Sequence, residues 1–159
     1  MANRLKTVKV AFITDDNYVV PTAVAVQSLV NSFSKDRECD IYIICDGVSE
    51  ENKKKFVQTA KDFTSINVHP IDADADELAA LHKSINSEFM VANTTALLKF
   101  NLSNIFADAD KLLYLDGDIL VNFDVSEIYD VELGDNYVAA VRDLPQVFFT
   151  KQDFGEDTE

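Results

Sequence analysis

The feature that most constrains this chain is an alternation of apolar, strand-like runs with helical segments. VKVAFITD (8–15) and DIYIICDG (40–47) are rich in β-branched residues and end in acids, which predicts two buried strands. The first is followed by residues 22–34, whose apolar side chains recur at helical spacing, and the second by a helix that we expect to begin after Ser49. Strands that alternate with helices in this way predict an α/β fold with a mostly parallel sheet.

The rest of the chain continues the alternation. The sequence predicts further strands and helices, in chain order a strand at 66–72, helices at 76–84 and 91–106, and strands at 111–116 and 137–142. We therefore expect one folded unit over residues 1–151, followed by a frayed acidic tail at 152–159. Ligands of such sheets bind beyond the carboxyl ends of the strands, where this chain places several acids.

Composition excludes some classes of function. The formal net charge of −14 makes a nucleic acid or an anionic membrane an unfavourable partner, because repulsion replaces counterion release, and it favours a divalent cation. No apolar run approaches the roughly 18 residues that span a bilayer, and the first residues lack the apolar segment of a secretory signal. We therefore expect a soluble, cytoplasmic protein with no transmembrane segment.

Cysteines, histidines and glycines narrow the chemistry further. Cys39 and Cys45 lie in one predicted strand, about 20 Å apart when extended, so we expect free thiols, as in a reducing compartment. His69 and His82 have no partner at zinc-binding spacing, so we expect structural or surface roles. The four glycines form neither glycine-rich phosphate-binding motif, so any phosphate must be held in another way.

KLLYLDGDILV (111–121) places two acids and a glycine inside an otherwise apolar run. Residues i and i+2 of a strand project from the same face, so Asp116 and Asp118 could present two carboxylates to one point, with Gly117 giving the backbone room. Two like charges so placed call for a counterion. Carboxylate oxygens suit Mg²⁺ or Mn²⁺, which take one or two protein carboxylates and complete their shells with phosphate oxygens and water.

Other interpretations compete for the same stretch. Asp-Gly between apolar runs also predicts a tight hairpin, and nothing in the local sequence excludes it. Another structural use of the two acids is also open. A calcium loop does not fit, because its acids would continue at position 120, which is Leu120.

Five blocks taken together resemble a known family. They are FITDDNY (12–18), VSEEN (48–52), LLKFNLSNIF (97–106), KLLYLDGDILV (111–121) and LGDNYVAAVRDL (133–144). In this order the chain resembles, from about residue 7 to about residue 146, the retaining glycosyltransferases of family 8, which include bacterial galactosyl- and glucosyltransferases of lipopolysaccharide synthesis and glycogenin. The resemblance implies the GT-A fold, a Rossmann-like sheet flanked by helices, and favours the metal interpretation of the two acids.

The resemblance also assigns residues to the donor site. It implies that Asp116 and Asp118 bind Mn²⁺, or Mg²⁺, which bridges the diphosphate of a UDP-sugar. Asp15 is expected to accept a hydrogen bond from the uracil ring, Asn17 to contact the nucleoside and Tyr18 to line the cleft. For Asp15 and Asn17 a simple strand-to-helix turn is the alternative, because these residue types also favour turns.

Two further residues follow from the resemblance. Lys99 stands where the family usually has an arginine that reaches the diphosphate or the donor sugar, and lysine keeps the charge but loses bidentate geometry. Its alternative is a solvated helix lysine. Asp143 matches an acid that faces the sugar-binding cleft and is the candidate catalytic residue, with a strand-end cap as the alternative.

The function implied is metal-dependent, retaining transfer of a hexose from a UDP-sugar to a hydroxyl of a saccharide or lipid-linked saccharide. The family's sequences continue past the matched region to a further metal-binding histidine, so we expect this chain to supply the donor-binding part, truncated on its C-terminal side, and to be weakly active or inactive. A binding module without turnover is the alternative, and a nucleotidyltransferase is weaker because its glycine-rich loop is missing. Exposed apolar surface on an incomplete sheet predicts a homo-oligomer.

Overall fold

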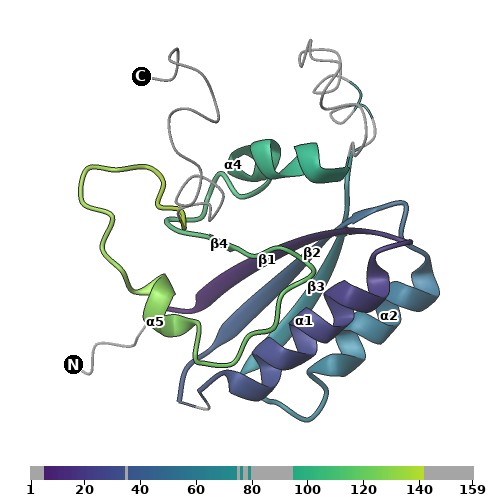
Figure 1. Cartoon of the computed structure of the whole chain (residues 1–159), viewed down its shortest axis with the longest axis horizontal. Helices are drawn as coiled ribbons and strands as arrows, with labels where there is room; N and C mark the ends of the chain where they lie inside the picture. Colours follow the sequence, from purple (N-terminus) through teal and green to yellow (C-terminus); the bar gives the residue numbers. More distant parts are fainter. Residues whose placement is uncertain (1–5, 35, 75, 77–78, 80–94, 142–159) are drawn as a thin grey trace, which may run out of the picture.

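The sheet is built around β1 (Val8–Asp15), which pairs in parallel with a strand on each side. β2 (Cys39–Asp46) lies on one side and β4 (Leu113–Tyr114) on the other, while β3 (Ile66–Asp72) pairs with β2, which gives the order β3-β2-β1-β4. The computed structural model describes residues 6–34, 36–74, 76, 79 and 95–141. Within them the four strands form the α/β sheet that the sequence predicts (Figure 1).

Alternation along β1 produces two apolar layers, one on each face of the sheet. Val10 and Phe12 belong to the larger core and Ala11 and Ile13 to the smaller one, as expected when successive side chains point to opposite faces. A parallel strand buried on both faces has no polar face, which explains the apolar run at residues 10–13.

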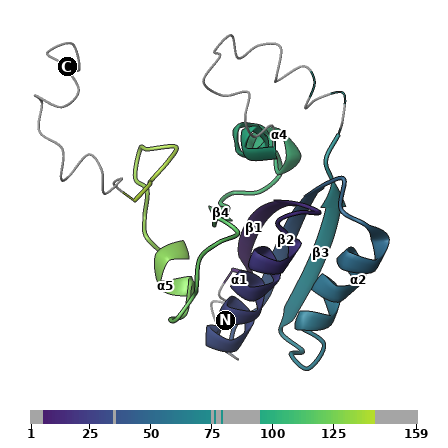
Figure 2. The same cartoon turned by 45° about the vertical axis from the view of Figure 1, so that its right-hand side comes forward.

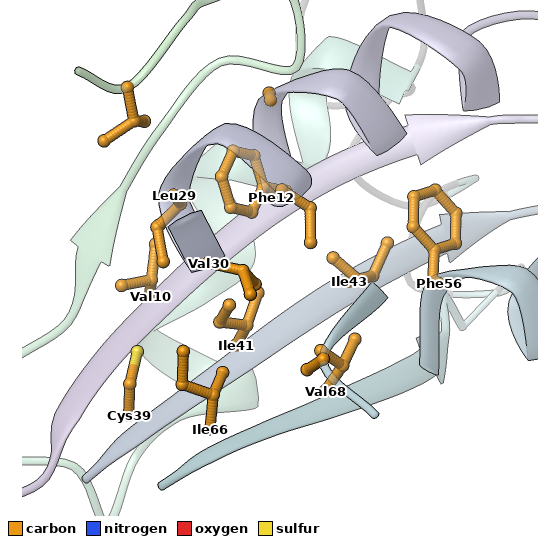
Figure 3. Close-up of a cluster of buried hydrophobic side chains, with 14 of the residues drawn as sticks. Val10, Phe12, Leu29, Val30, Cys39, Ile41, Ile43, Phe56, Ile66 and Val68 are labelled. Carbon is orange, nitrogen blue, oxygen red and sulfur yellow. The ribbon is translucent and has the colours of Figure 1, made fainter. Parts of the chain in front are cut away.

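Two helices cover the face of the larger core. α1 (Val19–Ser32) and α2 (Glu50–Thr59) lie side by side against the sheet (Figures 1 and 2). Their buried Leu29 and Phe56 pack in the same cluster as Phe12 (Figure 3). α2 begins at the predicted cap, where the Ser49 side chain accepts a hydrogen bond from the backbone N–H of Asn52.

The other face is covered by η2 (Thr95–Asn101), a 3₁₀ helix, and by α4 (Leu102–Ile105), which continues it. Leu98 and Leu102 pack with Ile44 in the smaller core. η2 begins with Thr95 at the carboxyl ends of the strands. From there η2 and α4 cross this face of the sheet before the chain enters β4.

A buried arginine fixes the segment that follows β4. α5 (Ser126–Tyr129) ends beside Asp130, whose two carboxylate oxygens accept hydrogen bonds of 2.6 and 2.9 Å from the guanidinium of Arg37. The Arg37 Nε also donates to the carbonyl of Lys6 at 2.9 Å, and the guanidinium lies 5.7 Å from the centre of the Tyr129 ring. Arg37 therefore links α5 to the amino-terminal end of β1.

Most predicted boundaries are confirmed. The strands at 8–15 and 66–72 are found at those residues, the second strand is shifted by one residue, and the first helix begins at Val19 rather than at 22. Cys39 and Cys45 are free and buried, as predicted. None of the helices among the described residues is both long enough and apolar enough to cross a bilayer.

Three predicted elements need correction. The described part of the predicted helix at 91–106 is a 3₁₀ segment from Thr95 followed by one α-helical turn, and Leu98 and Leu102 pack in the smaller core. The strand at 111–116 is two residues long, since the chain leaves β1 after Leu115, whose N–H donates to the carbonyl of Ala11. Residues 137–141 form no strand, because no described segment lies beside them to pair with. The predicted helix at 76–84 lies mostly outside the described residues, and the tail at 152–159 lies wholly outside them.

The Arg37–Asp130 pair generates a stability prediction. We expect Asp130→Asn to lower the free energy of unfolding by about 1 kcal/mol at neutral pH, a modest value because the Asp130 side chain is 54% exposed and its charge is screened. The Arg37 hydrogen bond lowers the pKa of Asp130. The difference in free energy of unfolding between wild type and Asp130→Asn should therefore have its full value above the ordinary aspartate pKa of about 3.9. It should disappear as the pH falls through the lower pKa that Asp130 has in the folded protein.

Urea unfolding at several pH values checks this prediction. Asp62→Asn, which removes the same charge from an exposed site on the loop after α2, is the matched control. An Asp130→Asn effect no larger than that of the control would contradict it.

Candidate functional site

A pocket of about 340 Å³ opens at the carboxyl ends of β1 and β4, beside the first residue of η2. It is lined by Ile13, Thr14, Asp15, Tyr18, Thr95, Tyr114, Asp116, Gly117 and Asp118. Three of these residues are acids and none of the described lining residues is basic. The pocket therefore favours a cation or the positive part of a ligand.

Asp116, Gly117 and Asp118 form the turn by which the chain leaves β4. The hairpin interpretation of this stretch is wrong, because β4 pairs in parallel with β1 and the described residues 119–122 form no strand. The buried Gly117 faces α1, while the two exposed acids line the pocket. Both carboxylates thus reach one hollow, as the i, i+2 spacing predicts, although they follow the strand rather than belong to it.

Each of these two acids accepts a hydrogen bond from a tyrosine hydroxyl. The Tyr114 hydroxyl donates to Asp116 Oδ1 at 2.8 Å, and the Tyr18 hydroxyl donates to Asp118 Oδ2 at 2.9 Å. The hydrogen bond to Asp118 raises the pKa of Tyr18, and burial followed by the hydrogen bond to Asp116 raises the pKa of Tyr114. Both phenols are therefore protonated donors at neutral pH.

Asp15 has a structural role in the same pocket. Its Oδ1 accepts a hydrogen bond of 2.9 Å from the backbone N–H of Tyr18, and its carbonyl accepts another from the same group at 3.1 Å. The turn from β1 into α1 is therefore built on Asp15, which is the structural alternative that the sequence left open. This bond uses one carboxylate oxygen, and the side chain still lines the pocket.

Asp16, next to Asp15, points away from the pocket. Its Oδ1 accepts hydrogen bonds from the Ser49 backbone N–H at 3.2 Å and from the Asn52 side chain at 2.9 Å. These bonds, with that from Asn52 the largest, lower the pKa of Asp16. Asp16 thus joins the start of α2 to the turn that carries Asp15.

Helix α1 supports the segment that carries the two acids. The buried Thr22 lies against Gly117, and Thr22 Oγ1 donates to the Tyr18 carbonyl at 2.9 Å and is hydrogen-bonded to the Thr14 hydroxyl at 3.1 Å. Further along the helix, the Val121 backbone N–H donates to the Ser28 hydroxyl at 2.9 Å and the Val121 carbonyl accepts from Ser32 at 3.0 Å. Hydroxyl side chains of α1 therefore hold the backbone of Val121, while Thr22 packs against Gly117.

The structure brings together most of the predicted site residues. Asp15, Tyr18, Asp116 and Asp118 all line the pocket. Asn17 is in the exposed turn before α1 and does not line the pocket. Lys99 does not line the pocket either: it is exposed on η2, with its ammonium 5.7 Å from the centre of the Phe100 ring. Asp143 lies outside the described residues.

Sequence reasoning missed Thr95, Tyr114 and Thr22. Thr95 lines the pocket and donates to Asp46 Oδ2 at 2.7 Å, which ties η2 to the end of β2. In the sequence, Thr22 is one of many residues of a predicted helix and Tyr114 one of many residues of a predicted strand. The signal that could have been used is the position of Tyr114 two residues before Asp116, because residues at this spacing share a face of a strand.

His69 is not among the residues that line the pocket. His69 lies on β3, where its ring stacks on Tyr42 at 5.1 Å and its Nε2 lies 3.3 Å from Asp40 Oδ1. This is the structural role that was predicted. His82 lies outside the described residues. Within the described ranges, no group of three or more ligand-type side chains is placed to hold one metal ion.

Residues 9–158 match the family described as glycosyl transferase family 8. The chain belongs to this family, and its four-stranded parallel sheet flanked by helices has the GT-A architecture of the family's solved structures.

Several proteins of known name are similar to the chain. The lipopolysaccharide 1,2-glucosyltransferase of Escherichia coli is 31% identical over 140 residues, 87% of this chain and 39% of that protein. General stress protein A of Bacillus subtilis is 27% identical over 135 residues, 83% of this chain and 45% of that protein. The chain therefore spans less than half the length of these relatives.

A solved structure of the galactosyltransferase LgtC, in complex with donor and acceptor sugar analogues, superposes on this chain with a TM-score of 0.73. The two are 29% identical, and the match covers 92% of this chain and 51% of LgtC. The bifunctional glycosyltransferase WbbM, at 24% identity and a TM-score of 0.74, shares the fold.

The contact between Gly117 and Thr22 generates a second prediction. A Cβ at position 117 would overlap Thr22 Oγ1 and lie 3.4 Å from Thr22 Cβ. Thr22 is fully buried and its hydroxyl is held by two hydrogen bonds, so it cannot turn away without losing them. We expect Gly117→Ala to lower the free energy of unfolding by about 1–3 kcal/mol through overpacking.

A double-mutant cycle with Thr22→Ala measures whether this contact is the cause. The double variant should be more stable than the sum of the single effects predicts, because the clashing oxygen is gone. Additive effects in denaturant unfolding would contradict the prediction.

Proposed function

We propose that this chain is the donor-binding part of a metal-dependent, retaining glycosyltransferase that transfers a hexose from a UDP-sugar to a hydroxyl acceptor. The observation that carries the proposal is the convergence of Asp116, Asp118, Asp15 and Tyr18 in one pocket at the carboxyl ends of β1 and β4. Membership of family 8 supports sugar transfer. Relatives named as lipopolysaccharide 1,2-glucosyltransferase and 1,3-galactosyltransferase support a saccharide or lipid-linked saccharide as acceptor.

The donor set of the pocket fits a divalent cation. Asp116 and Asp118 offer carboxylate oxygens, which are hard ligands that Mn²⁺ and Mg²⁺ accept, and these ions need only one or two protein carboxylates when a diphosphate supplies the remaining oxygens. A bound ion would neutralise charge on the diphosphate that leaves with UDP. The pocket also gives a reason for the ion, because its carboxylates alone would repel a diphosphate.

The nucleoside end of the donor is assigned to the start of α1. Asp15 has one oxygen engaged by the Tyr18 N–H and retains acceptor capacity for an N–H of the uracil ring. The Tyr18 side chain is 43% exposed at the pocket wall, and Asn17 stands in the adjacent turn. These three residues lie close enough along the chain to contact one nucleoside.

In the proposed reaction, the bond between the anomeric carbon and the diphosphate oxygen breaks, the acceptor oxygen bonds to the same carbon, and the proton of the acceptor hydroxyl passes to the departing UDP. Asp116 and Asp118 would hold the cation, which would supply positive charge to the leaving diphosphate, and Asp15, Asn17 and Tyr18 would hold the nucleoside. Lys99 is proposed to add positive charge near the diphosphate, and Asp143 to face the transferred sugar. Both of these assignments rest on the family resemblance.

The proposed compartment is the cytoplasm. The free and buried thiols of Cys39 and Cys45 agree with a reducing environment. Burial raises the pKa of Cys39 to about 12 and that of Cys45 to about 11, so neither thiol is a ready nucleophile for disulfide exchange.

Calorimetric titration of UDP into the protein tests the donor site. We expect binding in Mn²⁺ that is lost in EDTA and falls at least about tenfold, or 1.4 kcal/mol, in the double variant Asp116→Ala, Asp118→Ala. The matched control is Asp62→Ala with Asp108→Ala, which removes the same charge from two exposed positions outside the pocket. Equal binding by the two double variants would contradict the proposed site.

Self-association is also proposed, because Tyr137, Val138 and Val141 are 98%, 77% and 96% exposed. Sedimentation velocity should show a species larger than the monomer that decreases when Val138 and Val141 are both replaced by Asp. A monomer at all protein concentrations would contradict this proposal.

A further inference from the structure

Thr95 stands where the segment that covers the smaller core meets the carboxyl ends of the strands. Its hydroxyl donates to Asp46 Oδ2 at 2.7 Å, and Thr95 lines the pocket whereas Asp46 does not. Asp46 ends β2 and is paired in register with Asp15, which ends β1. The proposed function gives Asp15 a role and leaves Thr95 and Asp46 without one.

We propose that Thr95 accepts a hydrogen bond from a ribose hydroxyl of the donor nucleotide, and that Asp46 is the positioning residue that fixes the Thr95 hydroxyl for this contact. Thr95 is then a specificity-determining residue that distinguishes a ribonucleotide from a deoxynucleotide. This inference rests on the proposed function, because it concerns the same nucleotide in the same pocket.

The packing of η2 on β2 determines the place of Thr95. Residues three apart lie on the same side of a 3₁₀ helix, so Thr95 shares a side with Leu98, whose buried side chain packs with Ile44 in the smaller core. One such turn is about 6 Å long, and two residues of a parallel strand span about 6.6 Å. Thr95 therefore lies beside Asp46 when Leu98 lies beside Ile44.

The hydrogen bond to Asp46 determines what the Thr95 hydroxyl can offer to a ligand. A hydroxyl has one proton and two lone pairs, and here a carboxylate holds the proton. The hydroxyl oxygen is therefore left as an acceptor, and its donation to the carboxylate makes it a stronger one. The ligand group that meets Thr95 must bring its own proton.

Among the parts of a UDP-sugar, the ribose fits this acceptor. The diphosphate offers acceptor oxygens, and the N–H of the uracil ring is already assigned to Asp15. The ribose has hydroxyls at its 2′ and 3′ positions and lies between the base and the diphosphate. Because Asp46 is the register neighbour of Asp15, it holds Thr95 at the nucleoside end of the pocket. The hexose also carries hydroxyls, so the test uses UDP, which has none of them.

The test compares the binding of UDP, 2′-deoxy-UDP and 3′-deoxy-UDP by calorimetry in saturating Mn²⁺. We expect wild type to bind at least one of the two analogues more weakly than UDP. In Thr95→Val, which keeps the shape of the side chain, this preference for UDP should fall by about threefold to tenfold, the value of one hydrogen bond, because UDP loses affinity and the analogue does not. Thr95→Ser keeps the hydroxyl and should keep the preference. Asp46→Ala should lower it, since the hydroxyl proton is then no longer held.

Thr59→Val is the matched control, because Thr59 lies on α2, donates to the Phe56 carbonyl and does not line the pocket. Its preference for UDP should equal that of wild type. A Thr95→Val protein that keeps the wild-type preference, or a Thr95→Ser protein that loses it, would overturn the inference, and so would a wild type that binds both analogues as tightly as UDP. In these outcomes the proposed donor site stands. A wild type that binds no UDP in Mn²⁺ would instead contradict the proposed function, and this inference with it.

Discussion

The parallel pairing of β1 with β4 is the interaction on which the site depends. It joins only Val10 to Leu113 and Ala11 to Tyr114, yet it places β4 beside β1 in the same direction. Because the two strands run in the same direction, the acid that ends β1 and the acids that follow β4 lie at one edge of the sheet. Charges inside either strand would be buried between two apolar layers at high cost, so this edge is where the acids can stay ionised.

The three carboxylates of the pocket repel one another, so the folded protein must stabilise them even without a ligand. Asp15, Asp116 and Asp118 line the same hollow, and each is partly neutralised by a hydrogen bond rather than by a basic side chain. The N–H and the two hydroxyls stabilise the carboxylates and fix their orientation. A cation between these acids and an anionic donor would complete the neutralisation, which is the physical reason for proposing both ligands together.

The fold was largely predictable because the signals for it are local. Apolar, β-branched runs predict buried strands such as 8–15 and 66–72, and Ser49 predicts the start of a helix. The failures concern elements that depend on a neighbour. Residues 137–141 have a strand-like composition but no described partner, and β4 is shortened because its one pairing with β1 ends early. Strand composition therefore predicts the ability to pair, and pairing itself is a tertiary event.

The sequence by itself determined that Asp15, Asp116 and Asp118 lie at the carboxyl edge of the sheet, because they stand at or just after the positions at which apolar strands end. Only the tertiary structure decided how these acids are held. Tyr18 and Tyr114 donate to acids, and Thr22, Ser28 and Ser32 support the backbone of 117–121, through contacts across the fold that no local pattern encodes. The reason is that burial leaves a periodic signature in the chain, whereas a hydrogen bond between distant residues depends on the packing of the elements that carry them.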